Sequence, residues 1–342
     1  DQAERYCRQA LELARQLEDN AAVAAVLQPL AVGLAWRGRY AEAQASIAES
    51  VALSHSGGDP ISTAIAHAYQ GHISFFAGDY EAARKPLHDA CATLQIHHHI
   101  WGMAFASYGA GLVELMLRNL TAARIQLATA LDLDRSIGNR RGMIRSLWGL
   151  GHLAHLEGDM AAAGAQLAQS LALAHELGDA WSVGMAIEEL ASLLIDSGRA
   201  EEAARLLGLA EALRVSLGTP LPVPIAAQHT RSRQALRQRL GSQKLAALEA
   251  DGRGLTVEAV LQLGSVSATW LPAAASSVAE ALTVRETDVL RLLAQGLTDQ
   301  QIAQALVISP RTVHSHLTAI YGKLQVNNRS AATRWALEHG IR

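Results

Sequence analysis

The sequence has 342 residues, of which 50% are hydrophobic, 18% charged and only 4% aromatic. Ala and Leu dominate, and this composition favours helices over sheet. The net charge of −3 is uneven, because residues 281–342 hold 7 Lys and Arg against 4 Asp and Glu, whereas the rest of the chain holds 22 against 28. We therefore expect the C-terminal end to be the surface that meets nucleic acid.

No apolar run approaches the roughly 18 residues of a membrane span, so we expect a soluble protein without a membrane partner. Two cysteines, Cys7 and Cys91, lie far apart in helical patterns, which indicates a reducing cytoplasm and no disulfide framework. The chain begins at Asp1, inside a helical pattern and without an initiator Met or a signal peptide. We therefore expect a fragment of a longer protein.

Residues 1–217 repeat with a period of 40 residues. The pattern of residues 38–43, Gly-Arg-Tyr-Ala-Glu-Ala, returns at residues 78, 118, 158 and 198, with helical periodicity on either side of each copy. We predict two antiparallel helices per unit, the first at about 21–37 and the second at about 41–57 in the first full repeat. Such pairs stack into a superhelix, because no single pair can bury its own apolar face.

Small residues such as Gly71 and Ala43 occur where the paired helices must approach each other. At these positions the units resemble tetratricopeptide repeats, although the period of that family is about 34 residues. The resemblance implies that the first helix of each unit lines a concave wall with a groove for a peptide, a protein partner or a small effector. The candidate groove residues are His72, Tyr108, Arg145, Trp148, His152, His155 and Glu188. The alternative is a solvated concave face without a ligand.

A proline-rich run, residues 218–224, interrupts the repeats, and three short helical segments follow to about residue 263. We expect residues 218–263 to cap the open end of the superhelix, and residues 264–281, rich in Ser, Ala and Gly, to form a flexible linker. The triplet His97–His99 falls in a turn between repeats, where adjacent side chains cannot all reach one ion. We therefore expect a surface turn there and no metal site in the chain.

Helix-start signals divide residues 282–342 into four helices. Capping-box patterns at Thr283–Glu286 and Thr298–Gln301 open the first two helices, and Gly296 ends the first. A third helix begins at Ser309 and Pro310, and a fourth begins near Asn328. The tight connection between the second and third helices predicts a helix-turn-helix arrangement.

The third of these helices has two different faces. At about 100° per residue, an apolar stripe lies opposite a polar face without an acidic residue. The stripe consists of Val313, Leu317, Ile320 and Leu324. A narrow, donor-rich helix face suits the major groove of DNA, so we interpret this helix as a recognition helix. The alternative is a small packing module with an incidental polar face.

The run from Leu282 to Ile341 resembles the DNA-binding domain of LuxR/FixJ-type transcription regulators over its whole length. The shared residues include Gly296-Leu297-Thr298, Thr312-Val313 and Lys323-Leu324. The resemblance implies that the outward face of the third helix contacts bases and that its flanks contact phosphates. The implied DNA contacts are Arg311, His314, Ser315 and Thr318 at base edges, Thr312, Lys323 and Arg329 at phosphates, and Ser309 at the helix start.

One of these positions departs from the family. The family usually has Lys where this chain has His314, and often has a basic residue where it has Gly322. Fewer fixed cations imply weaker attraction to phosphates and a flatter dependence of binding on salt. A histidine on this face also implies that binding depends on pH near neutrality.

Together, the two parts resemble the C-terminal portion of large ATP-dependent LuxR regulators, the group that includes the maltose regulator. The resemblance implies ATP only in a domain upstream of this chain, which has no phosphate-binding loop of its own. We expect neither a cofactor nor an enzymatic activity here. The expected fold is all-α, a tetratricopeptide-like superhelix of helical hairpins followed by a four-helix LuxR-type helix-turn-helix domain.

The expected function is that of a bacterial, cytoplasmic transcription regulator. It would bind double-stranded promoter DNA as a homodimer and sense an effector or a protein partner through its repeats, with RNA polymerase as a further candidate partner. Two alternatives remain open. The chain could be a fragment of a signalling ATPase, or a repeat scaffold whose main role is protein–protein interaction.

Overall fold

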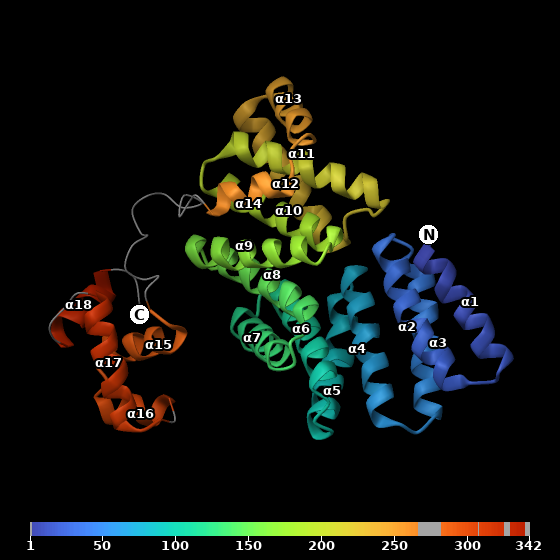
Figure 1. The fold of residues 1–342 in the computed structure, drawn as a ribbon, viewed down its shortest axis with the longest axis horizontal. Coiled ribbons are helices and arrows are strands. Elements are labelled where there is room, and N and C mark those ends of the chain that lie inside the picture. Colours follow the sequence, from blue (N-terminus) through green and yellow to red (C-terminus); the bar gives the residue numbers. More distant parts are fainter. Residues whose placement is uncertain (1, 266–281, 307, 325–328, 339–342) are drawn as a thin grey trace. The chain divides into compact units, whose positions relative to one another are not determined.

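The computed structural model describes residues 2–265, 282–306, 308–324 and 329–338 of the chain. They fall into two compact units, residues 1–266 and residues 267–342. All regular structure in the described ranges is α-helical, in eighteen helices (Figure 1). The prediction of an all-α fold is therefore confirmed. None of the described helices is long and apolar enough to cross a membrane.

The first unit begins with α1 (Gln2–Gln16) and continues with ten helices that pair into five hairpins. These are α2 (Asn20–Trp36), α3 (Tyr40–Ser56), α4 (Pro60–Phe76), α5 (Tyr80–Ile96), α6 (Ile100–Met116), α7 (Leu120–Ser136), α8 (Arg140–Leu156), α9 (Met160–Glu176), α10 (Ala180–Asp196) and α11 (Ala200–Leu217). Each begins 20 residues after the one before it. The predicted 40-residue repeat of helix pairs is therefore confirmed, and the predicted bounds differ from the observed ones by one residue.

Local chemistry explains why the helices end where they do. In the turn before α10, Gly178 has a φ of 65°, a left-handed conformation that glycine adopts without strain. Asp179 then accepts the backbone N–H of Ser182 at 3.1 Å, which caps the new helix. Within a hairpin the helices approach through small residues. A Cβ atom on Gly71 would lie 2.4 Å from Cγ of the buried Leu87, so only glycine fits there.

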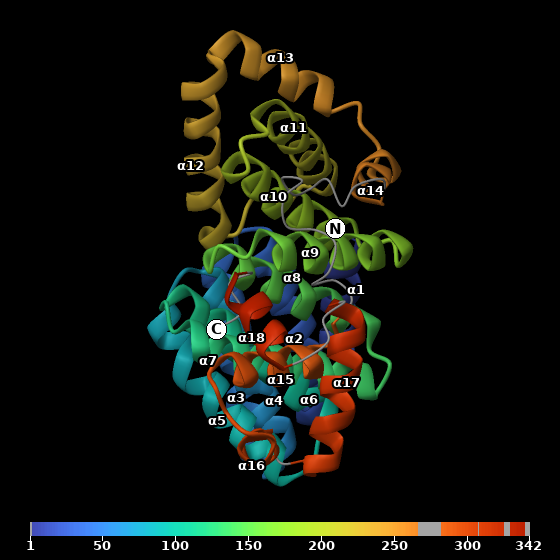
Figure 2. The same cartoon turned by 90° about the vertical axis from the view of Figure 1, so that its left-hand side faces the viewer.

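Three more helices follow the repeats, namely α12 (Val223–Leu240), α13 (Ser242–Gly252) and α14 (Val257–Ser265). Helix α13 packs tightly against α11, and α14 packs against α9, where His175 and Glu258 lie 3.1 Å apart (Figure 2). Helix α13 thus covers the last full repeat, and α14 lies on the fourth. The predicted linker, residues 264–281, begins too early, because Gly264 and Ser265 belong to α14; residues 266–281 lie outside the described residues.

Helix α12 and the residues before it do more than cap the superhelix. Pro220 lies against Gly38 in the turn after α2, and Val223 lies against Gly78 in the turn after α4. Pro222 and Ile225 lie beside residues of α6, α8 and α10. Residues 220–225 thus lie beside parts of all five full repeats, which the predicted capping role of residues 218–263 does not include.

Helices α15 (Val284–Ala294), α16 (Asp299–Leu306), α17 (Pro310–Leu324) and α18 (Arg329–Glu338) form the second unit. Its core is a cluster of buried side chains from all four helices. In the capping box at Thr283 and Glu286, each side chain accepts the backbone N–H of the other residue. In the second box, Thr298 Oγ1 accepts the N–H of Gln301 at 3.3 Å, and Gln301 Oε1 accepts the N–H of Thr298 at 2.8 Å. Gly296, at φ 83°, follows the first helix. The four predicted helices are therefore confirmed.

Candidate DNA-binding surface and repeat groove

The start of α17 is fixed by Ser309. Its Oγ accepts the backbone N–H of Thr312 at 3.1 Å and lies 2.8 Å from the hydroxyl of the same residue. Pro310 occupies the first helical position, where a missing N–H is harmless. Ser309 and Thr312 are both exposed. The predicted helix start is confirmed, whereas their contacts with DNA stay a prediction.

The two faces of α17 are separated as the sequence predicts. Val313, Leu317 and Ile320 are buried in the domain core. His314, Ser315 and Thr318 are exposed on the other side, and the Thr318 hydroxyl donates to the His314 carbonyl at 3.0 Å. Arg311 and Lys323 belong to α17 by their backbone, but their side chains lie outside the described residues.

Arg329 has a structural role that the sequence did not indicate. Its guanidinium donates to Asp299 Oδ1 at 2.6 Å and to the carbonyl of Leu297. These bonds tie the first turn of α18 to the first turn of α16, next to the helix-turn-helix. The implied phosphate contact of Arg329 stays a prediction, and in this structure its charge is shared with a carboxylate.

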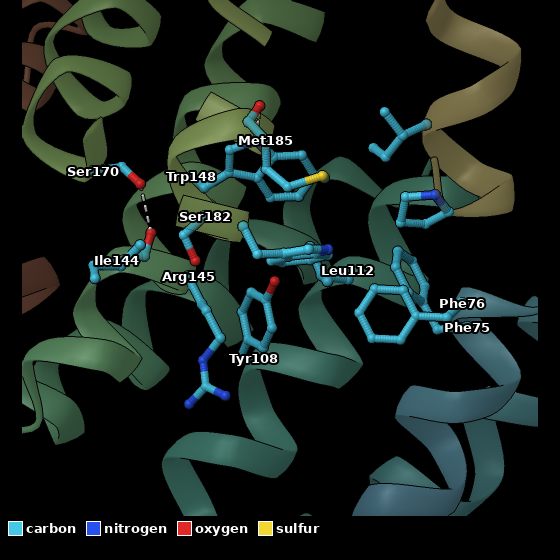
Figure 3. A pocket seen from close by; sticks show the side chains of 13 residues that line it. Phe75, Phe76, Tyr108, Leu112, Ile144, Arg145, Trp148, Ser170, Ser182 and Met185 are labelled. Atoms are coloured by element: carbon cyan, nitrogen blue, oxygen red, sulfur yellow. Dashed lines mark hydrogen bonds between the residues drawn. The ribbon is translucent and has the colours of Figure 1, made fainter. Parts of the chain in front are cut away.

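In the first unit, the predicted groove is divided by α12 into an aromatic part and a polar part. Tyr108, Trp148 and Met185 line the aromatic part, and the Trp148 Nε1–H donates to the carbonyl of Met185 at 3.2 Å (Figure 3). Pro222 and Ile225 of the α12 segment lie against these side chains and leave a cavity of about 20 Å³. This is close to the room of a single water molecule. The chain therefore fills the aromatic groove itself.

Arg145 forms part of the same wall and lies beside Tyr108 (Figure 3). Its guanidinium lies 5.3 Å from the ring centroid of Phe105 and 5.6 Å from that of Tyr108, within the range of a cation–π contact. Burial raises the pKa of Tyr108 to about 12, so its hydroxyl stays protonated. Arg145 and Tyr108 thus lie where the groove was predicted, but they are packed among themselves.

His72 does not line an open groove, and this part of the prediction is wrong. It is 3% exposed, its ring stacks on Phe105 at 4.2 Å, and its Nε2 lies 3.0 Å from the Phe105 carbonyl. Burial lowers the pKa of His72 to about 3, so the ring is neutral at physiological pH. A packed, neutral histidine holds α4 against α6 and cannot contact an effector without rearrangement.

Glu188 is also engaged inside the unit. It is buried, pairs with Arg214 of α11, and its Oε2 lies 2.9 Å from Nδ1 of His229 on α12. These contacts join α12 to the last repeat. The sequence placed Glu188 on the inner wall, but one of the basic residues that bind it, His229, comes from the segment predicted as a cap.

The neighbouring carboxylate, Glu189, connects three polar side chains beneath the groove. Nδ1 of His152 and Nδ1 of His155 lie 2.8 Å and 2.9 Å from its Oε1, and Gln228 of α12 donates to its Oε2 at 2.9 Å. Nε2 of His155 lies 3.0 Å from Asp196 Oδ2. Burial opposes the charge of Glu189, but the two histidines outweigh it and lower its pKa. Burial likewise opposes the charge of His155, but Glu189 and Asp196 outweigh it and raise its pKa.

A polar cavity of about 490 Å³ lies between this network and α12. Its polar lining includes His152 and His155 from α8, Ser192 and Asp196 from α10, and Gln228 and Arg231 from α12. The predicted groove residues therefore separate into Tyr108, Arg145 and Trp148 in the filled aromatic part, and His152 and His155 at the open polar part. The described residues contain no group of three His, Cys, Asp or Glu that could hold a metal ion.

The second unit matches a known family. Residues 280–336 match the bacterial regulatory proteins of the luxR family. A protein of Mycobacterium bovis named as an HTH-type transcriptional regulator is 34% identical over 144 residues, which cover 42% of this chain and 16% of that protein. The response regulator protein VraR of Staphylococcus aureus is 40% identical over 62 residues, which cover 18% of this chain and 30% of VraR. The matches thus span less than a third of either relative.

The C-terminal domain therefore belongs to the LuxR family of helix-turn-helix domains, which confirms the resemblance seen in its residues. Proteins with this family's domain include the named transcription regulators above, and the match in this chain is confined to residues 280–336. Among solved structures, that of BtubC from P. vanneervenii superimposes with a TM-score of 0.48 and 16% identity, over 63% of this chain and 91% of BtubC.

Proposed function

We propose that this chain regulates transcription in the bacterial cytoplasm by placing α17 in the major groove of promoter DNA. The observation that supports this is the exposed face of His314, Ser315 and Thr318, which has no acidic residue and stands on a buried apolar stripe. Arg311 completes the base-contacting face, while Thr312 and Lys323 contact phosphates. As in other helix-turn-helix proteins, a homodimer would bind two half-sites, and RNA polymerase is the further candidate partner.

The repeats, in this proposal, sense an effector or a partner. Support comes from the polar cavity, which α12 closes on one side, and from the bonds that join α12 to α10 through Glu188 and Glu189. A molecule in this cavity would contact both α12 and the repeat wall. Binding would therefore favour the arrangement in which α12 lies against the repeats, because a ligand shifts a conformational equilibrium toward the state that it binds better.

Fluorescence anisotropy of the full chain with labelled genomic promoter fragments, over a series of salt concentrations, tests the DNA-binding part. Arg311→Ala should weaken binding to the preferred fragment by about 5- to 150-fold, the range of one specific base contact. Arg291→Ala is the matched control, because Arg291 is an exposed arginine on α15, outside the recognition helix. Binding that is absent at low salt, or equally weakened by both changes, would contradict the proposal and favour a repeat scaffold.

A further inference from the structure

One turn of the repeats departs from the others of its kind. At the position that corresponds to residue 118, the other four turns have glycines with φ between 74° and 85°, namely Gly38, Gly78, Gly158 and Gly198. Arg118 adopts a φ of 65° there, a left-handed conformation that costs an L side chain free energy. Glu18 and His98, in turns between repeats, also have a positive φ, but of the three only Arg118 lines the polar cavity.

A second arginine, Arg231, lines the same cavity from α12. Among the described residues, the guanidinium groups of Arg118 and Arg231 have neither a hydrogen bond nor an ion pair. Arg214 and Arg233, by contrast, are each paired with a buried glutamate. The cavity thus has two guanidinium groups, on separate structural elements, whose donors are available to a ligand.

The carboxylates near the cavity do not neutralise these arginines. Asp196 is bonded to His155, and Glu189 is shared by His152, His155 and Gln228. Both carboxylates are therefore already engaged by neighbouring side chains of the unit. The two guanidinium groups add positive charge to the lining, which favours an anion, and arginine is suited to bidentate binding of phosphate or carboxylate.

The rest of the cavity is suited to a ligand larger than a simple ion. Its volume of about 490 Å³ falls within the usual range for small-molecule sites. Ser192 and Ser232 add hydroxyl groups to the lining, and Asp196 adds carboxylate oxygens. Such groups form hydrogen bonds with the hydroxyl groups of a polar ligand.

We propose that this cavity binds a small hydroxylated anion of the sugar-phosphate class, with the phosphate held between Arg118 and Arg231 and the hydroxyl groups directed toward Ser192, Asp196 and Ser232. The inference rests on the proposed sensing role of the repeats and gives its ligand a chemical class. Because Arg118 follows α6 and Arg231 belongs to α12, a bound phosphate joins α12 to the repeat wall. Ligand binding therefore stabilises the closed arrangement of α12.

Isothermal titration calorimetry and thermal melting of the full chain, with a panel of sugar phosphates, test this site without any DNA present. Glucose 6-phosphate, ribose 5-phosphate and glycerol 3-phosphate are the probes, while inorganic phosphate and glucose separate the contribution of the anion from that of the hydroxylated body. We expect saturable binding of at least one sugar phosphate, at least tenfold tighter than that of inorganic phosphate, and an increase in Tm. The proposal would be overturned if no sugar phosphate bound saturably, or if inorganic phosphate bound as tightly as the sugar phosphates.

Arg118→Gly is an informative variant, because it restores the residue of the other four turns and relieves the strained φ. It should keep or raise the Tm of the free protein and lose at least tenfold in ligand affinity. Arg231→Gln should lose affinity similarly. Arg141→Ala is the matched control, an exposed arginine that does not line the cavity. Unchanged affinity in both Arg118→Gly and Arg231→Gln would overturn the assignment of the site.

The same variants separate this inference from the proposed function. Arg118→Gly without ligand should bind promoter DNA as the unaltered chain does, because the substitution lies outside the DNA-binding domain. Ligand binding that leaves DNA affinity unchanged would support the site and contradict the sensing role. If the ligand changes the DNA affinity of the unaltered chain and of Arg141→Ala, but not that of Arg118→Gly, the result would support both the site and the sensing role.

Discussion

Trp36, at the end of α2, stacks on Trp181, in the first turn of α10, with ring centroids 4.9 Å apart and planes inclined by 13°. This contact joins the first full repeat to the fifth. Phe76 of the second repeat meets Trp181 edge to face at 6.1 Å. Trp181 also lies beside Pro222, at the start of the α12 segment. The superhelix is thus closed on itself where that segment enters it, so the stability of the closure and the position of α12 are linked.

Trp36→Ala should therefore loosen α12 as well as the repeats. The loss of the aromatic pair should cost about 1–2 kcal/mol of unfolding free energy, and hydrogen exchange of the α12 amides should become faster. Trp101→Ala is the matched control, since Trp101 has the same 36% exposure and stacks on Phe105 within its own helix. Equal acceleration of α12 exchange in both variants would contradict the link between the closure and α12.

The linkage between protonation and stability predicts an acid-sensitive site at His72. Its folded pKa of about 3 lies below the ordinary value of 6.5, so the unfolded chain binds more protons, and stability falls as pH falls from 6.5 toward 3. The loss at this site should be about 2 kcal/mol between pH 7 and pH 5. His72→Gln, which retains a hydrogen-bond donor, should show a smaller acid loss in urea unfolding at the two pH values. An unchanged pH dependence would contradict a buried neutral His72.

His155, which is paired with Glu189, predicts the opposite trend, namely a free energy of unfolding that falls as pH rises above neutrality. The folded pKa of His155 is raised above 6.5, so its stabilising contribution is complete below 6.5 and is lost as pH rises through the folded value. The folded pKa of Glu189 is lowered from 4.5, so its contribution is present above 4.5 and is lost on acidification. The substitution His155→Gln should remove the loss of unfolding free energy at alkaline pH. The unfolding free energies of the variant and the unaltered chain, compared at pH 6 and pH 9, check this.

Much of this architecture could be predicted from the sequence, because the signals are local. The 40-residue period and the Gly-Asp turns located the ten repeat helices, and the capping boxes located the starts of α15 and α16. The course of α12 could not be predicted, because its contacts, such as Val223 against Gly78, join residues far apart in the chain. For the same reason, the burial of His72 between aromatic rings gave no local signal.

In the DNA-binding domain, Arg329 should contribute to stability whether or not it also contacts DNA. Arg329→Ala removes its bonds to Asp299 and to the Leu297 carbonyl, which should cost about 1 kcal/mol and accelerate hydrogen exchange in the first turns of α16 and α18. If Arg329 also contacts a phosphate, the slope of log K against log salt should fall by about 1. Arg291→Ala should change neither quantity. Unchanged exchange in Arg329→Ala would contradict its structural role.

His314 provides a final prediction, because it replaces the lysine that the family usually has on the exposed face of the recognition helix. His314→Lys adds a permanent cation next to Ser315, without disturbing the buried stripe of Val313 and Leu317. Promoter affinity at low salt should rise, and the slope of log K against log salt should steepen by about 0.9, the value for one added phosphate contact. His55→Lys, the same change at an exposed site on α3, is the control. An equal effect of both substitutions would show non-specific charge attraction and contradict the placement of α17 on DNA.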